Sequence, residues 1–110
     1  MEIKWSELAS RQLGDIVEYV GNEYGRTVAL RTLDKITSKV QGLLKFPESG
    51  RLDREYSTKT HVVRHVLAGP NIIYYFVDND VIEVMLLAHC KMSNQKVVAM
   101  IKRFLEHYEK

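Results

Sequence analysis

The chain has 110 residues, of which 45% are hydrophobic and 27% charged, and its formal net charge is +2. This length suits one domain with a single modest core, and the composition excludes extended disorder, so we expect one domain over residues 1–110. No apolar run approaches the roughly 20 residues that cross a bilayer, the first ten residues do not predict a signal peptide, and the single cysteine, Cys90, suits the reducing cytoplasm.

The first half of the chain predicts a short alternating segment and two helices. EIKW precedes Ser6, which is suited to cap a helix, and apolar residues then recur at helical spacing as far as Tyr24. Gly25 should end this helix, and a second one should run from near Thr27 to Phe46-Pro47. Because only two or three residues join the helices, we expect an antiparallel hairpin.

The second half predicts three strands, because the apolar period changes from 3.6 to 2. Asp78-Asn79-Asp80 reads as a tight turn between the last two strands. The run IIYYFV is apolar on nearly both faces and indicates a central strand. The expected strands are His61–Leu67, Ile72–Val77 and Val81–Ala88.

The last strand and the last helix complete the predicted order. Strict alternation would place one uniformly apolar face of the last strand on the helices, namely Ile82, Val84, Leu86 and Ala88. Ser93 then begins a final helix. The order β-αα-βββ-α predicts an α+β fold in which a helical hairpin packs on one face of a small, mostly antiparallel sheet.

The basic side chains are unevenly distributed. Residues 1–50 hold equal numbers of acidic and basic side chains, whereas Arg51, Arg54, Lys59 and Arg64 fall close together. Such a cluster can contact nucleic acid or an acidic protein, and it can equally be an ordinary solvated face. Lys96, Lys102 and Arg103 on the final helix offer an alternative contact surface.

Metal and thiol chemistry find little support in the sequence. His61 and His65 are four residues apart on a predicted strand, about 13 Å, which is too far for them to chelate one ion together. His89 and Cys90 would point to opposite faces if their strand continues. We therefore expect no metal and no cofactor, and we interpret Cys90 as a structural cysteine rather than a nucleophile.

Metal-independent RNA cleavage is the enzymatic alternative. It needs a general base, a general acid and a cation that stabilises the phosphorane charge. Arg64, His89 and Lys91 are residues of the right types. Arg64 can equally be a solvent-facing charge on an outer strand. The aromatic run Tyr74–Phe76 fits the core better than a base-stacking surface.

An ordered set of motifs resembles the RelE/ParE superfamily of toxins from type II toxin–antitoxin modules. The resemblance covers nearly the whole chain and implies the same fold. It comprises I-K-W-S at the start, I-x-x-Y-V from Ile16, L-L-x-F-P-x-x-G-R at Leu43–Arg51, V-R-H-V-L-A-G around Arg64, and V-I-E-V-M-L-L-A-H at Val81–His89.

The superfamily divides by mechanism. RelE-like members cut messenger RNA on the ribosome, and the resemblance places one of their arginines at Asn71, which is neutral. ParE-like members bind DNA gyrase, and the F-P-x-x-G-R turn looks closer to theirs. Their His-x-x-Arg reads His89-Cys90-Lys91-Met92 here, so only Lys91 could replace the arginine. We therefore expect a ParE-like gyrase-binding toxin, with a RelE-like ribonuclease or a degenerate toxin as alternatives.

The resemblance also implies partners and a contact surface. A cognate antitoxin would neutralise the toxin by folding a C-terminal segment against the sheet and the helical hairpin, and a toxin dimer or a heterotetramer with antitoxin would be possible assemblies. We expect a cytoplasmic protein with no membrane contact. The expected binding surface comprises Arg51, Arg54, Arg64, His89 and Lys91, of which Arg64, His89 and Lys91 would be catalytic in a ribonuclease.

Overall fold

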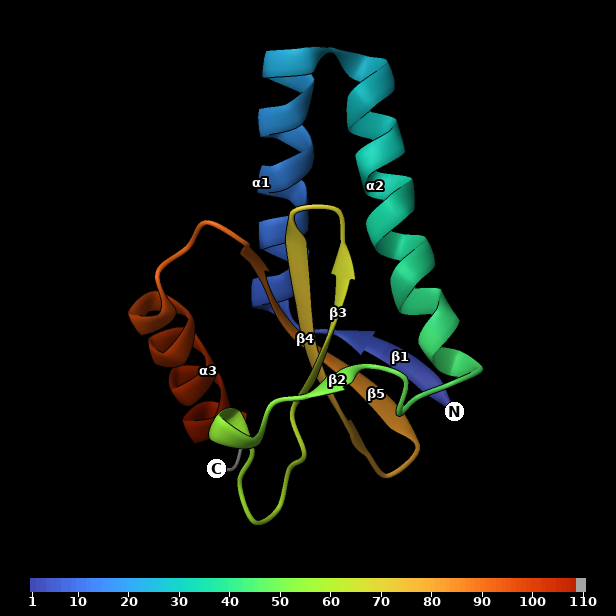
Figure 1. The fold of residues 1–110 in the computed structure, drawn as a ribbon. Coiled ribbons are helices and arrows are strands. Elements are labelled where there is room, and N and C mark those ends of the chain that lie inside the picture. Colours follow the sequence, from blue (N-terminus) through green and yellow to red (C-terminus); the bar gives the residue numbers. More distant parts are fainter. Residues whose placement is uncertain (109–110) are drawn as a thin grey trace.

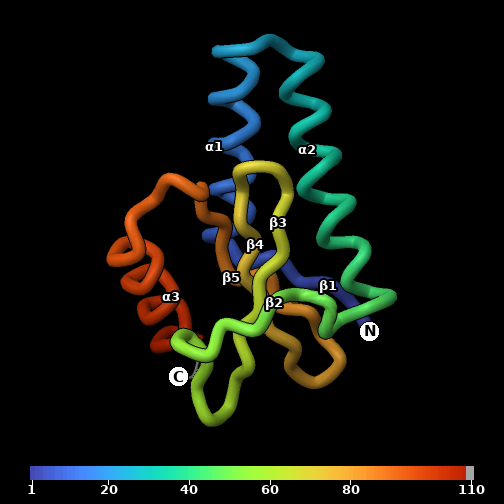
Figure 2. Tube along the Cα trace, in the orientation of Figure 1, coloured from blue at the N-terminus to red at the C-terminus, as the bar shows by residue number. Residues whose placement is uncertain are grey.

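The computed structural model describes residues 1–108, in which helices lie on both faces of one five-stranded sheet (Figures 1 and 2). The predicted order β-αα-βββ-α is confirmed, with one additional short strand, β2, after the hairpin. The elements are β1 (Glu2–Trp5), α1 (Glu7–Tyr24), α2 (Arg26–Gln41), β2 (Arg51–Leu52), β3 (Arg64–Ala68), β4 (Asn71–Asp78), β5 (Val81–His89) and α3 (Asn94–Tyr108), with 3-10 turns at Gly42–Leu44 and Arg54–Tyr56.

The sheet has the strand order β1-β5-β4-β3-β2. β4 lies in the middle, as its almost wholly apolar sequence predicted. β1 runs parallel to β5, and the other neighbouring pairs are antiparallel. The β4–β5 turn places Asn79 and Asp80 at positive φ, as the short, primed hairpin turns require. The sheet is therefore mostly antiparallel, as predicted.

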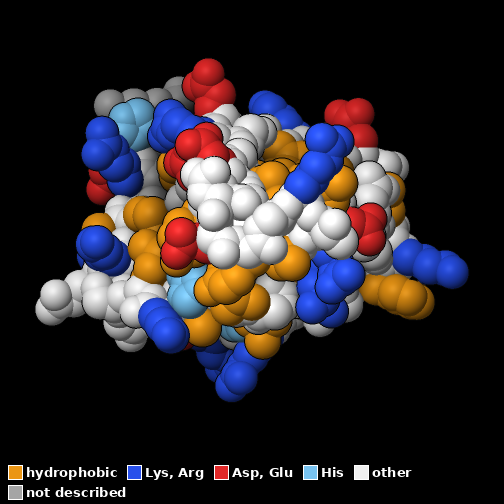
Figure 3. All heavy atoms as spheres, turned by 90° about the horizontal axis from the view of Figure 1, so that it is seen from above, with side chains coloured by type: hydrophobic (Ala, Val, Ile, Leu, Met, Phe, Trp, Pro, Cys, Tyr) orange, Lys and Arg blue, Asp and Glu red, His pale blue; other side chains and the backbone are white. Residues whose placement is uncertain are grey.

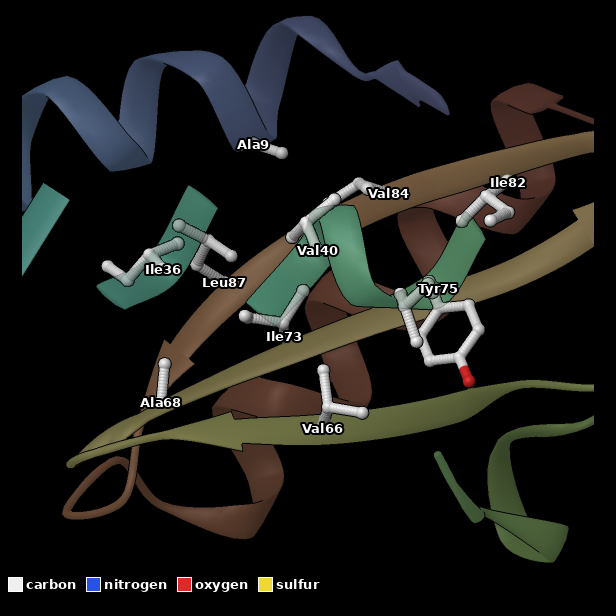
Figure 4. Close-up of a cluster of buried hydrophobic side chains, with 11 residues drawn as sticks. Ala9, Ile36, Val40, Val66, Ala68, Ile73, Tyr75, Ile82, Val84 and Leu87 are labelled. Atoms are coloured by element: carbon white, nitrogen blue, oxygen red, sulfur yellow. The ribbon is translucent and has the colours of Figure 1, made fainter. Parts of the chain in front are cut away.

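The α1–α2 hairpin packs on one face of the sheet. Ser6 caps α1, because its hydroxyl accepts a hydrogen bond from the Ala9 N–H at 2.9 Å. Gly25 alone separates the helices, and its φ of +94° explains why glycine stands there. Figure 4 shows side chains of both helices against those of β3, β4 and β5. This cluster includes Ala9, Ile36, Val40, Val66, Ile73, Tyr75, Ile82, Val84 and Leu87.

The α3 helix covers the opposite face of the sheet (Figure 1). Its buried residues Val97, Ile101 and Leu105 form a second apolar cluster with side chains from β4 and β5. The connection between α1 and α2 extends past the β3–β4 turn (Figure 1). Both faces of the central strands are therefore buried.

The predicted face of β5 is wrong in its second half. Tyr75 pairs with Val84 but Tyr74 pairs with Leu86, so Met85 forms a β-bulge. The extra residue shifts the alternation: Val84 and Leu87 face the hairpin, whereas Met85, Leu86 and Ala88 join the α3 cluster. The Ser6 hydroxyl donates to the Met85 carbonyl at 2.6 Å and Gln12 Oε1 accepts from the Leu87 N–H at 2.7 Å, so α1 satisfies the backbone groups beside the bulge.

Two predicted boundaries also need correction. The first of the three predicted strands begins at His61, but the corresponding strand β3 begins at Arg64, because the preceding residues bond to the loop beside them. Thr58 N–H donates to the His61 carbonyl, and Asp53 N–H donates to the Val63 carbonyl. The second helix was expected to reach Phe46, but α2 ends at Gln41 and a 3-10 turn follows.

Candidate functional site

Arg64 is held against the turn that follows the helical hairpin. It opens β3, opposite Tyr75 of β4. Its Nη1 donates hydrogen bonds to the carbonyl oxygens of Glu48 at 3.2 Å and Gly50 at 3.0 Å. Arg64 was predicted as a possible solvent-facing charge, but it is only partly exposed and one of its guanidinium nitrogens already fixes backbone.

The Tyr75 hydroxyl forms hydrogen bonds to the same turn. It accepts a hydrogen bond from the Gly50 N–H at 2.9 Å and donates one to the Pro47 carbonyl at 2.8 Å. A Cβ on Gly50 would lie 2.5 Å from this hydroxyl oxygen, so the close approach requires glycine. Burial raises the pKa of the Tyr75 hydroxyl, which therefore remains a neutral donor. The F-P-x-x-G-R turn is thus fastened by Arg64 and Tyr75.

Arg51 and Arg54 flank a histidine–aspartate pair. Arg51 pairs with His65 across β2 and β3, and His65 Nδ1 lies 2.8 Å from Asp53 Oδ2. Burial raises the pKa of Asp53, while the hydrogen bond from His65 and the charges of His65 and Arg51 oppose that rise. Both arginines are exposed. The structure therefore brings Arg51, Arg54 and Arg64 to one end of the β2–β3 edge.

The pair of His65 and Asp53 was not singled out from the sequence. The residues are 12 positions apart, and Asp53 lies in a loop with no periodic pattern. Together they fasten that loop to β3. No signal in one sequence connects them, because the loop conformation decides the contact.

His89 and Lys91 lie at the opposite end of the sheet. His89 is the last residue of β5, and its Nδ1 accepts a hydrogen bond from the Lys91 N–H at 3.1 Å. The Cys90 Sγ lies 3.9 Å from the same nitrogen. All three residues are exposed. His89 pairs with Asn71, which is buried, and both line a small hollow with Gln12 and Asp15 of α1.

The candidate residues therefore form two separate groups. Arg64 is opposite Tyr75, whereas His89 is opposite Asn71 on the same strand. Four residue steps separate Tyr75 from Asn71, which is about 13 Å along β4. Arg51, Arg54 and Arg64 lie at one end of the sheet, with Arg51 and Arg64 on opposite faces because Arg51 pairs with His65, and His89 and Lys91 lie at the other end. One phosphodiester group could not contact Arg64 and His89 together.

On the face of the molecule that Figure 3 shows, the exposed Lys and Arg side chains do not gather in one patch. In Figure 3 they are distributed around the outline of the molecule, with hydrophobic side chains between them. Lys96, Lys102 and Arg103 are exposed on α3, as the alternative contact surface requires. Within residues 1–108, no three His, Cys, Asp or Glu side chains are grouped so that they could hold a metal ion. No helix in this range is long and apolar enough to cross a membrane.

Known proteins resemble this chain in sequence and in fold. A family model described as "ParE toxin of type II toxin-antitoxin system, parDE" matches residues 3–94. The Sinorhizobium fredii protein named "Putative toxin Y4kP" is 32% identical over 96 residues, which cover 87% of this chain and 95% of that protein. A chain from the structure titled "Chromosomal ParDE TA system from P. aeruginosa" is similar in fold, with a TM-score of 0.66 at 19% identity, over 81% of this chain and 95% of that one.

Proposed function

Because the chain belongs to the ParE toxin family of type II toxin–antitoxin systems, we propose that it arrests growth by binding DNA gyrase in the cytoplasm and that a cognate antitoxin neutralises it. The family membership fixes the class of protein. The target, the binding mode and the antitoxin are the content of the proposal.

We favour a binding function over RNA cleavage because the candidate catalytic residues lie far apart. Transfer of a phosphoryl group requires base, acid and cation within hydrogen-bond reach of one phosphate. Arg64 and His89 lie at opposite ends of the sheet, and the residue of the central strand beside His89 is the buried, neutral Asn71. A binding surface has no such requirement, because separate cationic groups can contact separate acidic groups of a large partner.

The proposed contact surface keeps both groups of basic residues. Arg51 and Arg54 are exposed, and His89 and Lys91 are exposed at the far end. Arg64 contributes through the guanidinium nitrogens that do not bond to the Glu48 and Gly50 carbonyls. Charge-assisted hydrogen bonds to carboxylates of gyrase or of the antitoxin would give these contacts their strength.

The proposal of an antitoxin partner is supported by a protein of similar fold. The P. aeruginosa chain of similar fold comes from a ParDE toxin–antitoxin system. We infer that this chain likewise pairs with an antitoxin, in a heterotetramer or around a toxin dimer.

Expression in a sensitive bacterial host tests the function directly. We expect growth arrest with DNA damage, inhibition of gyrase supercoiling by the purified protein, and intact messenger RNA. Arg51→Glu/Arg54→Glu should weaken gyrase inhibition at least tenfold, whereas Arg26→Glu/Arg31→Glu, which reverses two exposed arginines of α2, should leave it within twofold. Ribosome-dependent message cleavage that disappears in His89→Ala would support the ribonuclease instead, and unaffected growth would leave only a degenerate toxin.

A further inference from the structure

A groove between α1 and α3 lies outside both groups of candidate residues. It has a volume of about 590 Å³ and opens between the first turns of α1 and the C-terminal half of α3. At the left of Figure 3, the side on which α3 lies, Lys, Arg and His side chains stand beside hydrophobic ones. The lining residues are Leu8, Arg11, Met100, Arg103, Phe104 and His107, with Glu7 at the α1 end.

The floor of the groove is apolar and fixed in position. Leu8, Met100 and Phe104 are half-buried and pack against the α3 cluster. The Phe104 ring stacks on Tyr108, with 6.0 Å between ring centroids, and meets Phe76 edge-on at 6.5 Å. These side chains therefore keep apolar surface exposed to solvent in a preformed shape.

The rim of the groove is cationic. Arg11 projects from α1 and Arg103 from α3, both are exposed, and neither forms an ion pair with any of residues 1–108. The ring of His107, also exposed, is oriented by a 2.8 Å contact between its Nδ1 and the Arg103 carbonyl. Among the lining residues within 1–108, Glu7 is the one carboxylate, and it stands in the first turn of α1, where it offsets the helix dipole.

We propose that this groove binds an amphipathic helix of a partner protein, with the helix's apolar side chains on the floor and its carboxylates on Arg11 and Arg103. Apolar floor and paired cationic rims are the complement of such a helix. Seven residue steps separate Met100 from His107, about 10 Å of helix, so the groove contacts about two turns of its partner. Guanidinium groups also bind carboxylates in a bidentate geometry, which fixes the register of the docked helix.

The proposal takes the antitoxin as the source of this helix, and in that respect it rests on the proposed function. The groove would then extend the antitoxin's contacts to the α3 side of the molecule, beside the first turns of α1. Nucleic acid would use the arginines and could stack on Phe104 but would leave Leu8 and Met100 without a partner, so we favour the peptide.

Binding of synthetic peptides to the full chain tests the groove. The probe is a fluorescent amphipathic helix with leucine along one face and glutamate on both flanks, and the matched control peptide has glutamine in place of glutamate. We expect the glutamate peptide to bind at least tenfold more tightly than the glutamine peptide and to lose affinity as salt is raised. Arg11→Glu/Arg103→Glu should lower the affinity for the glutamate peptide at least tenfold and should raise the affinity for a lysine-flanked peptide.

Arg26→Glu/Arg31→Glu, which lies outside the groove, should leave peptide affinity within twofold and serves as the charge control. Hydrogen exchange should show protection by the peptide at residues 7–11 and 100–107. Each of four results would overturn the proposal. They are equal affinity for the two peptides, an unchanged peptide affinity of the Arg11→Glu/Arg103→Glu variant, hydrogen-exchange protection confined to other segments, and tighter binding of a DNA or RNA oligonucleotide than of the peptide. Growth arrest is measured separately. A toxic chain that does not bind the peptide would refute the proposed groove alone, and a chain that binds the peptide without arresting growth would refute the proposed function alone.

Discussion

Replacement of Tyr75 by phenylalanine removes one hydroxyl and leaves two backbone groups of the turn without a partner. Tyr75 is fully buried, and its hydroxyl bonds to the Gly50 N–H and the Pro47 carbonyl. A buried donor left unsatisfied costs about 1–3 kcal/mol, whereas the half-exposed Pro47 carbonyl can turn to water and should cost about 1 kcal/mol. We therefore expect Tyr75→Phe to lower the free energy of unfolding by about 2–4 kcal/mol.

Urea unfolding followed by circular dichroism measures this loss. The transition midpoint should fall with little change in the slope, and the melting temperature should drop by roughly 4 °C per kcal/mol for a domain of this size. Tyr19→Phe is the matched control, because Tyr19 is 61% exposed and should change stability by less than about 0.5 kcal/mol. A Tyr75→Phe protein as stable as Tyr19→Phe would refute the role of the hydroxyl.

A double-mutant cycle connects Tyr75 to Arg64. Both side chains hold the same turn, so Arg64→Met should cost less in the Tyr75→Phe background than in the natural chain, with a coupling of at least about 0.5 kcal/mol. Additive losses would show that the two side chains stabilise different parts of the fold. The cycle also bears on function, because toxicity lost in an Arg64 variant counts as a contact effect only where stability is preserved.

Two further predictions concern the sheet and its helix cap. Glu83 is buried beside Lys4, and burial raises its pKa above 4.5, so the folded chain takes up this proton at higher pH than the unfolded chain. The stability that the neutral carboxyl contributes is present below pH 4.5 and is lost as the pH rises through the folded pKa. The free energy of unfolding of Glu83→Gln should therefore exceed that of the natural chain at pH 7 and equal it in acid. A difference in stability that persists below pH 4 would contradict this origin. Ser6→Ala should cost about 1–2 kcal/mol in thermal unfolding, since it removes the α1 cap and the bond to the Met85 carbonyl, whereas Ser6→Thr should retain most of that stability and the exposed Ser10→Ala should be neutral.

Local patterns were sufficient to predict the element order, the helical hairpin and the central place of β4. They failed in β5 for a physical reason. Val84 to Ala88 are all apolar and all buried, so their sequence contains no polar residue that would mark a change of face. The bulge at Met85 is stabilised by Ser6 and Gln12, about 75 residues or more away in the chain, and no periodicity reports such contacts.

The candidate site was predictable in its residue types and unpredictable in its assembly. The basic residues Arg51, Arg54 and Arg64 do share one end of the sheet. The separation of Arg64 from His89 depends on the register of β3, β4 and β5, which one sequence does not determine. Asp53 and His65 were missed because the conformation of a loop that contains a 3-10 turn brings them together.

The hydrogen bonds of the 47–50 turn change how the family resemblance bears on mechanism. The F-P-x-x-G-R motif, Arg64 and Tyr75 are joined in one hydrogen-bonded set, so their joint presence is explained by the need to build this turn. Such residues therefore report the fold and do not distinguish gyrase binding from RNA cleavage. The departure from the RelE-like pattern lies at Asn71 and the departure from the ParE-like His-x-x-Arg lies at Met92, where β4 begins and β5 ends at the other end of the sheet. Mechanism is therefore best tested at that end, with His89 and Lys91, and Arg64 is best treated first as a residue that stabilises the turn.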